Sequence, residues 1–173
     1  AFHGRCREMI LEDCLVYTVW DASKWSAADW VANACNGINL GYEGFDHVAR
    51  RNYVRNTRFA ILAEAQACLA EWNLVENFSG DGCRATFDDV SIRRNIIKNC
   101  YKVDDNHDDG IQSYLANVGP GTVRGVSIVG NVIVNNDDPA QPLAGPLQGI
   151  GFFDGPFVDY VIENNLVLVD HWH

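Results

Sequence analysis

A short motif, Asn-x-[Val/Ile]-x-Asn or a near relative, recurs along the chain, and this repeat constrains the fold more than any other feature of the sequence. Five copies begin at Asn52, Asn73, Asn95, Asn131 and Asn165, and a sixth begins with Cys14 in place of Asn. The starts are 38, 21, 22, 36 and 34 residues apart, so the underlying step is about 22 residues and the long gaps hold insertions. A period of this size predicts stacked structural repeats.

Two further short motifs recur with the same period, and each forms a column of equivalent positions when the repeats are aligned. One is a glycine followed by an apolar residue, at Gly37-Ile38, Gly82-Cys83, Gly110-Ile111 and Gly149-Ile150. The other precedes the Asn motif, at Val90-Ser91-Ile92, Val126-Ser127-Ile128, Tyr160-Val161-Ile162 and, more weakly, Cys68-Leu69-Ala70. Each repeat thus contains three short strands of alternating pattern joined by Gly, Asn and Asp turns. Helical periodicity is largely absent, and only residues 26–34 are predicted to form a short helical turn.

Three short strands cannot bury a core alone, but stacked repeats can. Strands of successive repeats would lie in parallel about 4.8 Å apart and bury a shared column of Ile and Val. Asn at each corner would adopt the left-handed backbone conformation, and its amide would hydrogen-bond to Asn in the repeats above and below. The sequence therefore predicts an all-β parallel β-helix.

The pattern resembles the right-handed parallel β-helix proteins of the pectate-lyase-like superfamily, in particular the right-handed β-helix repeat proteins of bacteria and their phages. The resemblance extends from about Arg7 to Val169. It implies a right-handed, single-stranded solenoid of about six coils of about 22 residues with inserted loops. A leucine-rich repeat solenoid and a β-sandwich are the competing architectures, and the first lacks its Leu-x-x-Leu-x-Leu core.

The phase of the repeat bears on domain organisation. The first repeat starts part-way through a coil, and the last lacks the strand that would follow its Asn motif. Residues 1–173 are therefore expected to be a single β-helix domain that is a segment of a longer β-helix. The rest of that chain, or neighbouring subunits as in a homotrimer, would cap the open ends.

Charge excludes some partners. The chain has 13 Lys and Arg against 23 Asp and Glu, and its formal net charge is −10. It lacks the basic surface that nucleic acid requires, and anionic lipid would repel it. No apolar run approaches the roughly 18 residues of a membrane-spanning helix, so membrane insertion is not expected. The compartment stays open among extracellular, periplasmic and virion-associated.

Inserted loops would wall a groove along one outer sheet, which is the natural place for a site. They are predicted at Trp20 to Asn36, Val103 to Asp109 with Leu115 to Thr122, and Asn136 to Pro146. The second holds the densest polar cluster, residues 104–109, in which neighbouring carboxylates raise one another's pKa. Catalytic roles are expected for Asp105, His107 and Asp109, and Asp104 and Asp108 are candidate Ca²⁺ ligands. The alternative is a solvated acidic turn.

Outward positions of the strands that follow the glycine column should align across coils. Arg84 and Gln112 would then be neighbours one coil apart. Arg84 would hold a sugar carboxylate and stabilise an enolate, while Tyr114 or His107 would move the proton. The expected substrate-binding residues on the same face are Glu64, Gln112, Phe153 and Asp154. The alternative role for Arg84 is a surface cation that balances the acidic loops.

Aromatic residues favour sugar contact, since their faces stack on sugar rings. Trp25 in the first insertion and Phe153 beside Asp154 are the candidates, although such residues also pack loops onto a solenoid. Asp105 and His107 resemble the Asp-x-His of mannuronan C5-epimerases. The preceding Tyr101 is displaced by one position, and Asn106 stands where that signature has Pro.

Two functions remain. The first is a carbohydrate-active β-helix that binds an extended, uronate-containing or neutral polysaccharide in an outer groove. It would cleave this polymer as a polysaccharide lyase or a glycoside hydrolase. The second is a structural or receptor-binding segment of a phage tailspike, fibre or phage-like particle. Convergence of Asp105, His107 and Arg84 within hydrogen-bonding reach would favour the first.

Overall fold

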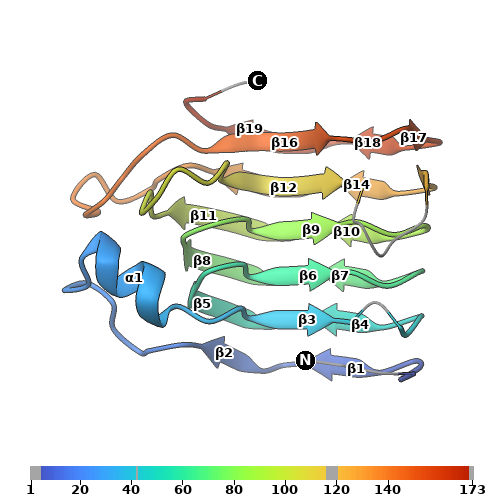
Figure 1. The fold of residues 1–173 in the computed structure, drawn as a ribbon, viewed down its shortest axis with the longest axis horizontal. Coiled ribbons are helices and arrows are strands. Elements are labelled where there is room, and N and C mark those ends of the chain that lie inside the picture. Colours follow the sequence, from blue (N-terminus) through green and yellow to red (C-terminus); the bar gives the residue numbers. More distant parts are fainter. Residues whose placement is uncertain (1–4, 42, 116–120, 172–173) are drawn as a thin grey trace.

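The computed structural model describes residues 5–41, 43–115 and 121–171, and its strands form stacked parallel sheets (Figure 1). The first sheet contains β1 (Ile10–Glu12), β4 (Val48–Arg50), β7 (Leu69–Glu71), β10 (Ser91–Arg93), β14 (Ser127–Val129) and β18 (Val161–Glu163). The second contains β2 (Leu15–Tyr17), β5 (Tyr53–Thr57), β8 (Leu74–Phe78), β11 (Ile96–Cys100), β15 (Val132–Val134) and β19 (Leu166–Leu168).

The third sheet positions the candidate site. It contains β3 (Ile38–Leu40), β6 (Ile61–Ala63), β9 (Cys83–Ala85), β12 (Asp109–Tyr114) and β16 (Gln148–Phe153). A fourth, two-stranded sheet pairs β13 (Val123–Arg124) with β17 (Phe157–Val158). The chain visits the three large sheets in rotation, so each strand pairs in parallel with its counterpart in the next turn. The predicted all-β class with stacked parallel sheets is confirmed, and the arrangement fits a parallel β-helix.

The predicted asparagine ladder runs along the corner between the first and second sheets. At each step, the backbone N–H and Nδ2 of one Asn donate to Oδ1 of the next. The N···O distances are 2.9 and 2.9 Å from Asn73 to Asn95, and 3.0 and 3.0 Å from Asn95 to Asn131. Each Nδ2 also donates to a backbone carbonyl, as from Asn95 to Ala70. The ladder thus satisfies polar groups that the stacked strands bury.

The closing Asn of three motif copies adopts the expected left-handed conformation, with φ of 50° at Asn56, 58° at Asn77 and 63° at Asn99, but the ladder Asn that opens each copy does not. Positive φ occurs instead at the residue immediately before each ladder position, as at Arg51 (53°), Trp72 (56°) and Arg94 (55°). The reason is that a ladder Asn must keep its own N–H aligned with the next Asn. The preceding residue therefore makes the turn.

The core is a set of inward-facing columns. Val54, Val75, Ile97 and Ile133 of the second sheet are fully buried above one another. In the third sheet, Gly82 is required by close approach, because a Cβ there would lie 2.4 Å from Cγ2 of Ile97. The absence of a side chain at this position therefore lets the backbone that leads into β9 pack directly against the core side chains of the second sheet.

In the described residues, one helix interrupts the strands, within the segment predicted to form a helical turn. It is α1 (Ala27–Asn33), and it projects from the side of the stack beside β5 and β8 (Figure 1). Ser26 caps it, and Asp29 completes a capping box. No helix in the described ranges is long and apolar enough to cross a membrane. Residues 116–120 of the predicted insertion from Leu115 to Thr122 lie outside the described residues.

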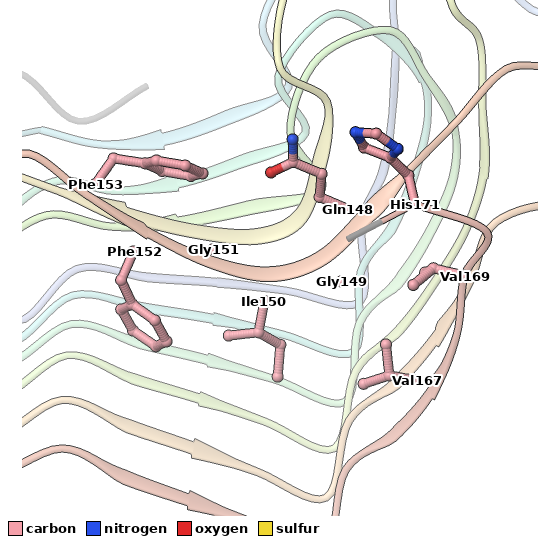
Figure 2. Close-up of a pocket in the computed structure, with 9 residues that line it drawn as sticks. All are labelled: Gln148, Gly149, Ile150, Gly151, Phe152, Phe153, Val167, Val169 and His171. Carbon is pink, nitrogen blue, oxygen red and sulfur yellow. The ribbon is translucent and has the colours of Figure 1, made fainter. Parts of the chain in front are cut away.

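The two faces of β16 differ in character (Figure 2). Ile150 and Phe152 point toward the interior. A cavity of about 400 Å³ lies at this strand and is lined by residues of both faces, Phe153 as well as Phe152. Gln148 and Phe153 lie on the other side of the strand. That outer face of the third sheet carries the candidate site.

Candidate active-site groove

Register on the third sheet brings most of the predicted site residues together. Arg84 of β9 pairs with Gln112 of β12, as expected, and Gln112 pairs in turn with Gly151 of β16. Two positions further along, Tyr114 pairs with Phe153. An open cavity of about 490 Å³ lies over these strands, and we call it the groove. Its lining residues are Arg84, Asp105, Asn106, His107, Gln112, Tyr114, Phe153 and Asp154.

A second cavity of about 250 Å³ adjoins the groove. It shares Asp105, Asn106 and His107 with the groove and is completed by Lys102, Asp108, Pro146, Gln148 and His171. The predicted catalytic pair Asp105 and His107 is exposed at the boundary between the two cavities. The His107 ring lies 5.8 Å from that of Phe153, measured between centroids.

Local hydrogen bonds fold the loop that precedes β12. The backbone N–H of Asn106 donates to Oδ1 of Asp104 (3.0 Å), and its side-chain amide donates to Oδ1 of Asp108 (3.0 Å). Lys102 Nζ donates to the Asn106 carbonyl oxygen. This Asx-turn geometry turns Asp105 and His107 to solvent and directs Asp108 and Asp109 inward.

Arg84 forms a buried ion pair with Asp81. The Nε–Oδ2 distance is 2.6 Å, and the two side chains are 15% and 0% exposed. The guanidinium carbon lies 3.7 Å from the ring centroid of Phe59 and 5.4 Å from that of Tyr114. Asp81 and Phe59 were not predicted as site residues. Strict alternation from Arg84 would place Asp81 on the inward side with Cys83, so the sequence pattern carried no signal for this partner.

Asp109 lies beneath the groove next to Asp81, and burial raises the pKa of both carboxyl groups, that of Asp81 despite the neighbouring Arg84. Asp109 is fully buried, and its backbone N–H donates to Oδ1 of Asp81 (3.2 Å). Burial, followed by the charge of Asp81, raises the pKa of Asp109 to about 7. Gln112 Nε2 donates to Oδ2 of Asp109 (2.9 Å), whereas Oδ1 has no hydrogen-bond partner among the described residues.

The free oxygen of Asp109 lies beneath Gly151 and Phe153. A Cβ on Gly151 would stand 2.4 Å from Asp109 Oδ1 and 2.6 Å from Cε2 of Phe153. The absence of a side chain at position 151 therefore leaves room for both groups. Movement of the Phe153 ring would open a path from the groove to this oxygen.

The two predicted calcium ligands are instead paired with cations. Burial raises the pKa of Asp108 to about 6, although its Oδ2 lies 3.2 Å from Lys102 Nζ. Burial also acts to raise the pKa of Asp104, but the hydrogen bond from Arg58 (2.7 Å) and that from the Asn106 backbone lower it overall. Across the described ranges, no group of three or more His, Cys, Asp or Glu residues is arranged to hold a metal ion.

The remaining predicted residues lie in different surroundings. Glu64 follows β6, and burial raises its pKa despite the charge of Arg84 and a hydrogen bond with Asn39. Trp25 is not among the groove-lining residues. It packs edge-on against Trp30, with ring centroids 5.3 Å apart, in the cluster that holds the first insertion on the solenoid.

A scan of family models, a search of curated proteins and a search of solved structures each returned no match for this chain. The site is therefore interpreted from its own chemistry.

Proposed function

We propose that this protein is a right-handed parallel β-helix of about six coils, of the pectate-lyase-like type, that binds an extended polysaccharide in the groove and hydrolyses it. The observation that carries the proposal is Asp109. It is a buried carboxyl group whose pKa is raised to about 7, and one of its oxygens, which has no hydrogen-bond partner among the described residues, lies beneath Gly151 and the groove residue Phe153. Such a group suits general acid catalysis, because it can protonate a departing glycosidic oxygen at physiological pH.

The other groove residues complete the reaction. The polymer would lie across the strands of the third sheet and displace the Phe153 ring, which would bring a glycosidic oxygen to Asp109 Oδ1. Asp109 donates its proton to that oxygen as the bond to the anomeric carbon breaks. The exposed carboxylate of Asp105 accepts a proton from the water that attacks this carbon. Gln112 holds Asp109 in place, and Arg84 neutralises Asp81 beneath it.

The proposal is tested by incubating the protein with a panel of soluble polysaccharides and measuring new reducing ends between pH 4 and 9. At least one polymer is expected to be cleaved, with a rate that falls as pH rises through about 7, where Asp109 loses its proton. Asp109→Asn should lower that rate by roughly 10²- to 10⁴-fold. The matched control is Asp159→Asn, which changes an exposed carboxylate outside both cavities.

Three outcomes would contradict hydrolysis by Asp109. The first is full activity of the Asp109→Asn variant. The second is products that absorb in the unsaturated-uronate band, which would indicate elimination. The third is the absence of products from every polymer, which would instead favour a structural or adhesive role.

A further inference from the structure

We infer that the groove selects an uncharged polysaccharide and rejects polyuronates. The inference rests on the proposed function and adds the substrate class. Arg84, which was expected to hold a sugar carboxylate, is instead paired with Asp81 of the protein itself.

The cations around the groove are already neutralised by the protein's own carboxylates. Arg84 pairs with Asp81 at 2.6 Å, and Arg58 pairs with Asp104 at 2.7 Å. Lys102 lies 3.2 Å from Asp108. A uronate carboxylate would have to share a cation whose charge a protein carboxylate already balances. Its attraction to that cation is therefore weaker than to an unpaired one.

Carboxyl groups outnumber the cations at the same surface. Asp105 and Asp154 line the groove and are exposed, and they form no ion pair in the described part of the chain. Glu64 adds one more carboxyl group near the guanidinium of Arg84. A polymer with a negative charge on every sugar would therefore meet repulsion along the groove, and the net charge of −10 adds to it.

The same residues are well suited to hydroxyl groups. The carboxylate of Asp105 accepts hydrogen bonds from sugar hydroxyls, and the side chains of Gln112 and Tyr114 offer both donors and acceptors. The rings of Tyr114 and Phe153 lie on paired positions of β12 and β16, where they present apolar faces to the C–H side of a sugar. An uncharged glycan satisfies all of these groups without displacing an ion pair.

The test uses matched polymers that differ only in charge. Soluble glucan, galactan and mannan, each alone and after oxidation at C6 to the corresponding uronate, are cast into native gels with EDTA. The mobility of the Asp109→Asn protein is then measured, because this variant binds without cleaving. At least one neutral polymer should retard the protein, and its oxidised partner should bind at least tenfold more weakly.

A second variant tests whether the pairing of cations with protein carboxylates causes the rejection of uronates. Asp104→Asn releases Arg58 from its partner, so this change should strengthen binding of the oxidised polymer several-fold, whereas Asp159→Asn should not. Stronger retardation by a uronate than by its neutral parent, in EDTA or only with Ca²⁺, would overturn the inference. Retardation by no polymer would also overturn it.

The binding test is separable from the proposed hydrolysis. If wild-type protein cleaves an oxidised polymer in an Asp109-dependent reaction and leaves its neutral parent intact, the substrate inference fails and hydrolysis stands. If a neutral polymer binds and no reducing ends appear, the substrate inference stands and the hydrolysis fails.

Discussion

Asp109 is the residue at which the proposed chemistry and the stability of the fold oppose each other. The side chain is fully buried and has one oxygen without a hydrogen-bond partner among the described residues. Its pKa rises from 3.8 to about 7 because burial and Asp81 disfavour the charged form. The Asp109→Asn variant cannot ionise, and its amide oxygen can still accept the hydrogen bond from Gln112. We therefore predict that this variant is more stable than wild type at neutral pH.

The size and sign of the effect follow from proton linkage. Below pH 3.8 the carboxyl group is protonated in both states and contributes no difference. Between that value and about 7, the unfolded chain releases the proton while the folded protein keeps it, so the free energy of unfolding falls as pH rises. A shift of about three pH units at about 1.4 kcal/mol per unit corresponds to a loss of about 4 kcal/mol. Asp108 adds to the wild-type slope because its pKa is also raised, to about 6.

Urea denaturation from pH 4 to pH 8 measures the effect. The Asp109→Asn protein should match wild type near pH 4 and exceed it by up to about 4 kcal/mol near pH 8. Asp159→Asn, an exposed carboxylate changed in the same way, should follow the wild-type curve. Parallel curves for Asp109→Asn and wild type, or a variant that is less stable at pH 8, would refute the assignment of a protonated Asp109.

Two further substitutions test the architecture by urea denaturation. Asn95→Ala should lower the free energy of unfolding by about 3–6 kcal/mol, because it leaves several buried groups of the neighbouring ladder steps unpaired. Asn33→Ala, which removes one exposed helix hydrogen bond, should lower it by less than about 1 kcal/mol; equal losses would contradict the ladder. Gly82→Ala should cost about 1–3 kcal/mol because its Cβ would meet Ile97, whereas Gly121→Ala meets nothing within 4 Å; a tolerated Gly82→Ala would refute this tight packing.

Much of the fold could be predicted because the solenoid repeats the same environment. Ladder positions such as Asn73 and Asn95 occupy one geometry in successive turns, so one residue type recurs there. Prediction was weaker where the repeat varies. Ala60-Ile61 occupies a place in the glycine column and was missed, because Ala stands where the other copies have Gly. The left-handed conformation was predicted for Asn at the corner without distinguishing the two Asn of the motif, and the closing one adopts it, as at Asn77.

The candidate site was only partly predictable. The neighbouring positions of Arg84 and Gln112 followed from strand register alone, and the structure confirms them. The partner of Arg84 did not follow, because Asp81 lies outside the conspicuous acidic segment and three residues earlier in the chain. Trp25 was grouped with sugar contacts on spacing, yet its ring packs against Trp30. Pairing and packing depend on side-chain directions that a one-dimensional pattern does not encode.

The stacking that makes this fold regular also creates the electrostatic problem that defines the groove. Parallel neighbours repeat about every 4.8 Å, so acidic residues in one outward column are forced close together. Asp81 and Asp109 occupy such a column, and Asp109 donates its backbone N–H to Asp81. The solenoid offers two ways to relieve this repulsion. Arg84 lies 2.6 Å from Asp81, although burial still raises the pKa of Asp81, and the pKa of Asp109 rises to about 7. A carboxyl group with a raised pKa therefore arises here from strand register itself, and the inserted loop shapes the surface above it.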